Sequence, residues 1–178
     1  PTEAKQAGDN PFQVVLWRSL RHGPRLTDLL QTWIHFFTKG EVAIPSGEDE
    51  QISMLIECLR RWRCLLILDD AEGILHEVNT TGGKVQRYAG YNELFRRIAI
   101  SSHQSCLLCI TDEQFRRMEQ LMQSDGSSVR AMRLRPLSSM ASQLLLRRQG
   151  ITASDSVLAQ AACHYAGQPL ALLEAAHT

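Results

Sequence analysis

The feature that most constrains the fold of this 178-residue chain is an unbroken apolar run that ends in two acids, CLLILDD at residues 64–70. A continuous apolar strand is typical of a parallel sheet that is covered on both faces. In open α/β sheets, ligands bind at the edge where the parallel strands end. We therefore expect Asp69 and Asp70 to lie at the functional edge of an α/β fold.

The rest of the chain alternates between the patterns of strands and helices. Short apolar runs predict further strands at residues 14–17, 105–111 and 129–134. Apolar residues at helical spacing predict helices at about residues 26–37, 52–62, 91–98 and 115–122. Strands that alternate with helices favour an α/β fold with a parallel sheet.

From Ser138 onward the pattern becomes entirely helical. Ser138 or Ser139 can cap a helix that runs to Gly150, and Ser154 or Asp155 can cap a second one. A proline at residue 169 suits the first turn of a third helix. We expect two parts, an α/β core over residues 1–136 and the start of a helical subdomain over residues 137–178. Residues 1–11 look like a helix tail or a linker.

Composition excludes several classes of protein. Lys and Arg number 19, as do Asp and Glu, so the formal net charge is zero. This balance argues against a protein that grips nucleic acid through a broad basic face. The sequence holds neither a signal peptide nor an apolar stretch long enough to cross a membrane. We expect a cytoplasmic protein, with neither nucleic acid nor a membrane as its partner.

The cysteines and the arginine pairs carry weaker signals. The five cysteines lie in apolar segments, which favours reduced, buried thiols. His103, Cys106 and Cys109 have spacing that a metal site could use, but on a strand Cys106 and Cys109 point to opposite faces, which favours core packing. The arginine pairs, among them Arg60 and Arg61, have the spacing of solvated helix faces, with phosphate contact as the alternative.

An apolar strand that ends in two acids is also the Walker B pattern. The first acid, Asp69, would hold Mg²⁺, and the second, Asp70, would polarise the water that attacks a nucleotide. The alternative is a strand that simply ends at a solvent-exposed acidic turn.

Four further segments accompany this pattern in a fixed order. They are FQVVLWRSLR from residue 12, YNELFRR from residue 91, HQSCLL from residue 103 and GQPLAL from residue 167. In that order, over about residues 11–178, the chain resembles the NB-ARC (AP-ATPase) domain of the STAND class of P-loop NTPases. The resemblance is greatest to bacterial, especially cyanobacterial, members that carry WD repeats. It implies a P-loop NTPase-like parallel sheet with a C-terminal helical subdomain, in which exchange of ADP for ATP acts as a signalling switch.

The resemblance also implies roles for single residues. Asp69 matches the acid that holds Mg²⁺ and Asp70 the acid that acts in catalysis. Arg18 matches an arginine near the nucleotide phosphates. Gly167 and Pro169 match a Gly-x-Pro motif whose proline packs on the adenine and ribose side of the nucleotide.

Two departures from the family pattern bear on activity. No Gly-x-x-x-x-Gly-Lys-Ser/Thr occurs in the sequence, so the loop that cradles phosphates is expected upstream of Pro1. Family members also follow the strand at 105–110 with Thr/Ser and a sensor Arg. Here Thr111 is followed by Asp112, which would repel a phosphate.

The missing segment has a structural counterpart. In this class of fold the P-loop strand lies between the strand at 105–110 and the strand at 129–134. We therefore expect a gap at this point, two unpaired apolar edges, and a chain that is an excerpt of a longer polypeptide.

Three functions remain open. The first is an ATP/ADP-dependent switch module of a STAND-type signalling or defence protein, not a competent ATPase by itself. The second is a degenerate scaffold for protein interaction or self-association that binds no nucleotide, and the third is an active ATPase with its P-loop upstream.

Overall fold

A computed structural model describes residues 3–5, 11–72, 74, 89–112 and 128–177. They form a mixed α/β fold with a short sheet and six helices in two units, residues 1–130 and residues 131–178. The predicted helix at 115–122 lies outside the described residues.

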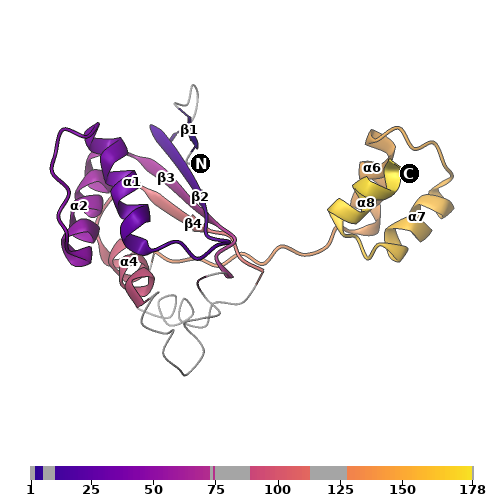
Figure 1. The fold of residues 1–178 in the computed structure, drawn as a ribbon. Helices are drawn as coiled ribbons and strands as arrows, with labels where there is room; N and C mark the ends of the chain where they lie inside the picture. The colour runs from indigo at the N-terminus through magenta and orange to yellow at the C-terminus, as the bar shows by residue number, and fades with distance from the viewer. Residues whose placement is uncertain (1–2, 6–10, 73, 75–88, 113–127, 178) are drawn as a thin grey trace. The chain divides into compact units, whose positions relative to one another are not determined.

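The first unit contains a four-stranded sheet in the order β1-β2-β3-β4 (Figure 1). Strands β2 (Val14–Ser19), β3 (Cys64–Asp69) and β4 (Cys106–Cys109) are parallel, as the alternating pattern predicts. Two helices, α1 (Leu26–Thr38) and α2 (Glu48–Arg61), connect β2 to β3, and α4 (Ala89–Ile100) precedes β4.

Strand β1 (Glu3–Lys5) is a correction to the sequence analysis, which expects a helix tail or linker there. It pairs antiparallel with β2, in the register Glu3↔Trp17. An edge strand is held by backbone hydrogen bonds on one side only, so it needs no apolar pattern. This polar segment therefore carries no strand signal.

The predicted strand at residues 129–134 is a second correction. These residues form neither a strand nor a helix, and most of their side chains are exposed. A strand requires a neighbour for its backbone groups. Within the described chain, β4 pairs only with β3, so residues 129–134 have no strand to join.

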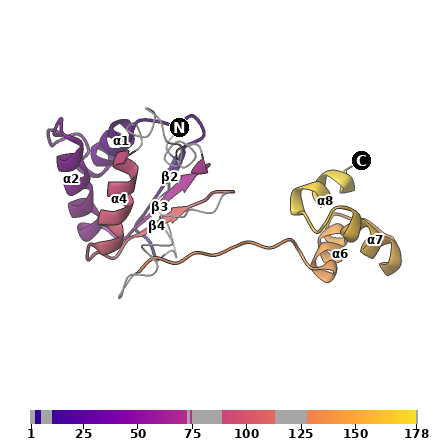
Figure 2. The ribbon, with the colours of Figure 1, turned by 90° about the horizontal axis from the view of Figure 1, so that it is seen from below.

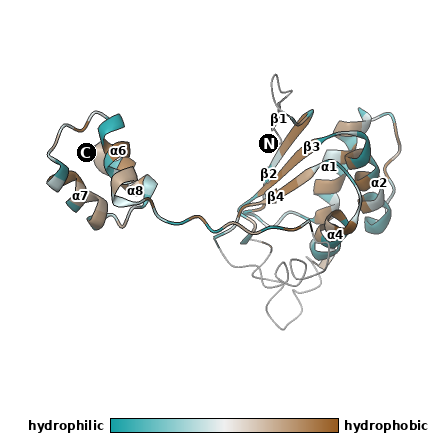
Figure 3. Ribbon diagram, turned by 180° about the vertical axis from the view of Figure 1, so that it is seen from behind, coloured by the Kyte–Doolittle hydropathy of each residue, from teal (hydrophilic) through white to brown (hydrophobic). Residues whose placement is uncertain are grey.

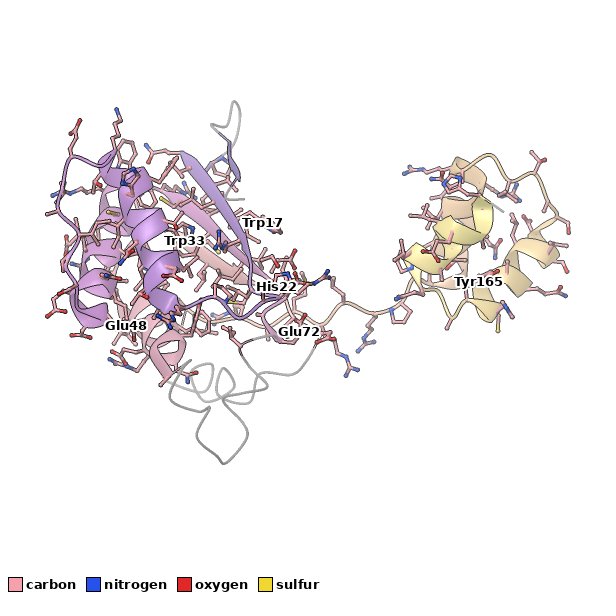
Figure 4. All side chains as sticks on the ribbon, in the orientation of Figure 1. Trp17, His22, Trp33, Glu48, Glu72 and Tyr165 are labelled. Atoms are coloured by element: carbon pink, nitrogen blue, oxygen red, sulfur yellow. The ribbon has the colours of Figure 1, made fainter. Side chains whose placement is uncertain are left out.

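Helices α1, α2 and α4 lie on the same side of the sheet (Figure 2). Their apolar residues meet alternate residues of the strands in one hydrophobic core, whose sheet members include Leu16, Leu66 and Leu68, all fully buried. Trp33 of α1 is also fully buried in this core and is labelled in Figure 4.

The other face of the sheet is apolar too. The register aligns Trp17, Ile67 and Leu108 across the three parallel strands, and Val15, Leu65 and Cys106 form the neighbouring row. Figure 3 shows the three strands coloured as largely hydrophobic. None of the helices α1, α2 and α4 of the first unit lies over this face (Figure 2), and Leu108 is 44% exposed.

The second unit is helical, as expected. Helices α6 (Ser139–Arg148), α7 (Asp155–His164) and α8 (Pro169–Ala176) pack around a small cluster of Leu146, Leu158 and Leu172. Ser138 caps α6, because its hydroxyl accepts a hydrogen bond from the Ala141 amide at 3.2 Å. Pro169 opens α8.

The prediction that all five cysteines are buried is wrong. Cys58 and Cys64 are buried and Cys109 is half-buried, but Cys106 and Cys163 are exposed. Cys106 lies on the face of β4 opposite to helices α1, α2 and α4. The alternation along β4 places Cys109 against the core instead.

Candidate functional site

Strand β3 delivers Asp69 and Asp70 to the carboxyl edge of the sheet. Asp69 is the last residue of the strand, in register with Ser19 at the end of β2. The Asp70 amide donates a hydrogen bond to Oδ1 of Asp69 at 3.0 Å. Asp70 itself has a φ of 54°, in the left-handed region. The two acids therefore sit at the turn that leaves the strand.

Ser19 and Arg21 hold the Asp70 carboxylate. The Ser19 hydroxyl donates to Oδ2 of Asp70 at 2.6 Å, and it accepts a weaker hydrogen bond from the Arg21 amide at 3.3 Å. Nη2 of Arg21 lies 3.6 Å from Oδ1 of Asp70. The Arg21 side chain is 71% exposed and the Asp70 side chain 26%, so water screens this ion pair.

The end of β4 reaches the same edge. The Ile110 amide donates to the Leu68 carbonyl at 2.8 Å, and the Ala71 amide donates to the Ile110 carbonyl at 3.0 Å. These bonds fasten the chain after β4 to the turn that carries Asp70. Thr111 and the exposed Asp112 follow directly, so the edge carries a third acid where the resemblance expects an arginine.

The arginine that lies beside the acids is Arg21, whereas the sequence analysis names Arg18. Arg18 is in register with Leu68, and no hydrogen bond or ion pair of the described residues joins it to Asp69 or Asp70. Arg21 contacts Asp70 instead. The chain leaves β2 at Ser19, and the Leu20 amide donates to the Asp69 carbonyl at 2.7 Å, so the next residue is the one that faces the acid pair.

Gly167 and Pro169 belong to the second unit, where local packing accounts for Gly167. Its φ is 67°, and a Cβ atom at this position would lie 2.3 Å from the Leu137 carbonyl oxygen. The Leu137 amide also donates to the Gly167 carbonyl at 2.9 Å. Only a glycine allows this close backbone approach. Pro169 is exposed at the start of α8.

The donor set at the sheet edge suits Mg²⁺ in one respect. Proteins commonly hold Mg²⁺ through one or two carboxylates while the phosphates of the substrate supply further oxygens. Asp69 uses Oδ1 for the Asp70 amide, and no described residue hydrogen-bonds its other oxygen. Asp69 therefore fits a magnesium ligand better than Asp70, whose two oxygens face Ser19 and Arg21.

The cysteine motif forms no metal site. The described residues contain no group of three or more His, Cys, Asp or Glu side chains arranged to hold a metal ion. His103 instead lies against the chain, with Nε2 at 3.0 Å from the Ile98 carbonyl. Burial raises the pKa of the Cys109 thiol to about 12, an effect to which Cys106 adds. A neutral thiol is a poor metal ligand, which agrees with the core role.

None of the helices described above combines the length and the hydropathy that a membrane span requires.

Comparison with known proteins gives one informative match. Over 162 residues the chain is 33% identical to an uncharacterized WD repeat-containing protein of Nostoc sp. (strain PCC 7120). The match covers 90% of this chain but 13% of the relative. No family model matches the sequence, and no solved structure matches the fold. The chain is thus similar to one segment of a much longer WD repeat-containing protein.

Proposed function

We propose that this chain is the nucleotide-binding part of an ATP/ADP-dependent switch of the NB-ARC kind. The observation that carries the proposal is the pair Asp69 and Asp70 at the carboxyl edge of a buried parallel strand, between the ends of β2 and β4. The resemblance implies a P-loop strand beside the strand at 105–110, and among the described residues β4 pairs only with β3, which leaves its other edge unpaired there.

Each residue at this edge would have a separate role in binding the nucleotide. Asp69 would hold Mg²⁺, and this ion would offset the negative charge of the nucleotide phosphates. Asp70, oriented by Ser19, would accept a hydrogen bond from water near the terminal phosphate. Arg21, more than Arg18, has the reach to contact a phosphate, because it is exposed and already lies beside Asp70. Thr111, which follows β4 at the same edge, would add a hydroxyl.

A scaffold without nucleotide is the second candidate, and one observation favours it. Asp70 is engaged by Ser19 and Arg21, and Asp112 brings a further negative charge to the edge. Such an edge repels phosphate unless Mg²⁺ and a phosphate-binding loop offset the charge. On this view the chain serves protein interaction or self-association. The WD repeats in the name of the Nostoc relative favour protein partners under either proposal.

Calorimetric titration of the full-length gene product with ATP and ADP, with Mg²⁺ present, separates the candidates. The switch proposal expects a Kd tighter than about 100 µM, which corresponds to roughly 5.5 kcal/mol. Asp69→Ala should abolish the part of this affinity that depends on Mg²⁺, whereas Glu93→Ala on the exposed face of α4 should change nothing. Complete lack of binding by the natural protein would leave only the scaffold.

Hydrolysis distinguishes the switch from an active ATPase. Steady turnover of ATP by the same protein, lost in Asp70→Asn, would identify an ATPase whose phosphate loop lies elsewhere in the polypeptide. Tight binding without turnover is the result that the switch proposal expects.

A further inference from the structure

The opposite edge of the sheet, where the strands begin, contains a cationic cavity. Its volume is about 330 Å³, and it is open to solvent. Three separate segments converge on it: the approach to β2, the end of α2 and the loop before β4. The lining residues are Pro11, Gln13, Arg60, Arg61, Arg63 and Gln104. Because the described lining residues include three arginines and two glutamines and no acid, the cavity offers many hydrogen-bond donors.

Two contacts place Arg63 and Gln13. The backbone N–H of Gln13 donates to the backbone carbonyl of Arg63 at 2.8 Å. The side-chain Oε1 of Gln13 accepts from the backbone N–H of Arg63 at 2.8 Å. With Oε1 occupied in this way, the remaining groups of the Gln13 side chain are its two N–H donors. The Arg63 guanidinium lies 5.6 Å from the centre of the Phe12 ring, a cation–π contact that orients it.

Arg60 and Arg61 supply the other charges from the last turn of α2. Nη1 of Arg60 lies 2.5 Å from Oε1 of Glu57, so one carboxylate offsets part of its charge. The Arg61 side chain forms neither a hydrogen bond nor an ion pair with the described residues. The three guanidinium groups thus leave the cavity with a clear excess of positive charge.

The negative pole of helix α2, equivalent to roughly half an elementary charge, offsets only part of this excess. The carbonyl groups at a helix end carry partial negative charge and would repel an anion. Here the Ser105 hydroxyl, which has one proton to donate, lies 2.8 Å from the Trp62 carbonyl oxygen and 3.0 Å from the Leu59 carbonyl oxygen. The single proton satisfies one of these two carbonyl oxygens at a time.

We propose that this cavity binds a small molecule that carries two or more linked phosphate groups. Arginine recognises phosphate through paired N–H donors, and three guanidinium groups around one cavity can surround adjacent phosphates. An acidic peptide fits less well, because an extended strand sends successive side chains to opposite sides. The site lies at the other end of the strands from Asp69 and Asp70 and does not depend on the nucleotide proposal.

Calorimetric titration of the 178-residue chain with pyrophosphate, without Mg²⁺ and at low salt, tests the assignment. We expect a Kd below about 1 mM and at least about fivefold weaker binding in Arg61→Gln and in Arg63→Gln. Glu57→Gln should tighten binding by about twofold or more, because it frees the charge of Arg60. This gain cannot come from damage to the fold.

Arg96→Gln is the matched control. Arg96 forms the same i,i+3 ion pair on α4, with Glu93 at 2.6 Å, but it does not line the cavity. Its loss should leave the Kd unchanged. An equal weakening by Arg96→Gln, an unchanged Kd in Glu57→Gln, or a lack of any heat at about 5 mM pyrophosphate would overturn the proposal.

Two further ligands identify the chemistry. Inorganic phosphate should bind more weakly than pyrophosphate, because it carries a single phosphate group. A peptide of six glutamates should also bind more weakly than pyrophosphate. Tighter binding of the peptide would assign the cavity to acidic protein segments instead and so reject a small phosphorylated ligand.

Discussion

Asp70 shows how much of the candidate site the sequence could and could not predict. The apolar run before Asp70 predicts a buried strand, and the two acids at its end predict that the strand ends at the carboxyl edge of the sheet. The bond from the Ser19 hydroxyl to Asp70 joins residues 51 positions apart, so no local pattern encodes it. The left-handed φ of Asp70 has no local signal either, although Asp tolerates this region better than most residues. The contact between Arg21 and Asp70 likewise depends on the path of the chain after β2 and on the turn after β3, which bring the two side chains together.

The bond between Ser19 and Asp70 should contribute measurably to stability. Ser19→Ala should lower the free energy of unfolding of the first unit by about 1–2 kcal/mol, because it leaves a partly buried carboxylate oxygen without its donor. Ser19→Thr keeps the hydroxyl and should recover most of the loss. Urea denaturation of Ser19→Ala, Asp70→Asn and the double variant gives the coupling energy, and strict additivity of the two losses would show that the bond contributes nothing.

Two neighbouring residues in the second unit should respond in opposite directions. Gly167→Ala places a methyl group against the Leu137 carbonyl and should destabilise this unit by several kcal/mol, on the order of 3 kcal/mol. Ala166 has a φ of 50°, so Ala166→Gly should stabilise the unit by about 0.5–1 kcal/mol. Circular dichroism during denaturation measures both changes. Similar effects of the two substitutions would contradict the backbone geometry.

Cys64 makes the first unit sensitive to alkaline pH. Burial raises the pKa of its thiol from 9.0 to about 11, although the Ser105 hydroxyl partly offsets the effect. Because the folded state holds the proton more tightly than the unfolded chain, this stabilisation is complete below pH 9 and is lost as the pH rises through 11. Urea midpoints at pH values of about 8 to 11 should fall by an amount that corresponds to roughly 2 kcal/mol. Cys64→Ala should make this fall smaller without abolishing it, because burial also raises the pKa of the Cys109 thiol, to about 12. Cys163→Ala, at an exposed position, should leave the profile unchanged.

At the scale of the elements, the spacing of apolar residues predicts the helices, because each helix packs one apolar face against the core. The helical spacing of apolar residues locates α1, α2 and α4, and serine and proline locate the starts of α6 and α8. The two wrong predictions, for residues 3–5 and 129–134, both concern strand formation, which depends on a neighbouring strand. Residues 3–5 form β1 because β2 offers an edge, and residues 129–134 form no strand because no described strand lies beside them.

The two faces of the sheet should tolerate substitution very differently. Leu68 is fully buried among the helices, so Leu68→Ala should cost about 3 kcal/mol of unfolding free energy. Leu108 lies on the other face and is 44% exposed, so Leu108→Ala should cost less than about 1 kcal/mol. Thermal denaturation of the two variants gives the comparison. A loss at Leu108 as large as that at Leu68 would mean that this face is covered in solution.

At the scale of the whole molecule, the two units differ in the cores that support them. Among the described residues, the first has a core of twenty buried residues, whereas the second relies on three buried leucines and the half-buried residues around them. The shift of the sequence from alternating to all-helical patterns marks this division, because each part must bury its own apolar faces. The sequence does not reveal how strongly each part is held, since this depends on the buried side chains of each core.

Hydrogen exchange should reflect this difference. Amides of β3 and α1 should exchange the slowest, and amides of α6, α7 and α8 should exchange sooner, because local opening costs less where few apolar contacts are lost. Exchange followed by mass spectrometry at a fixed pH measures both sets in one sample. Equal protection of β3 and α8 would show that the small cluster is more stable than its composition suggests.

The pairing of β2 with β3 also has a consequence for synthesis on the ribosome. Val14 pairs with Cys64, so β2 emerges fifty residues before the strand that must lie beside it. At about 5–20 residues per second, the nascent chain would wait several seconds with the β3-facing edge of this strand unpaired. During this interval Leu16 and Trp17 are exposed to other nascent chains, so the yield of folded protein should depend on translation speed and on chaperones that shield this one strand.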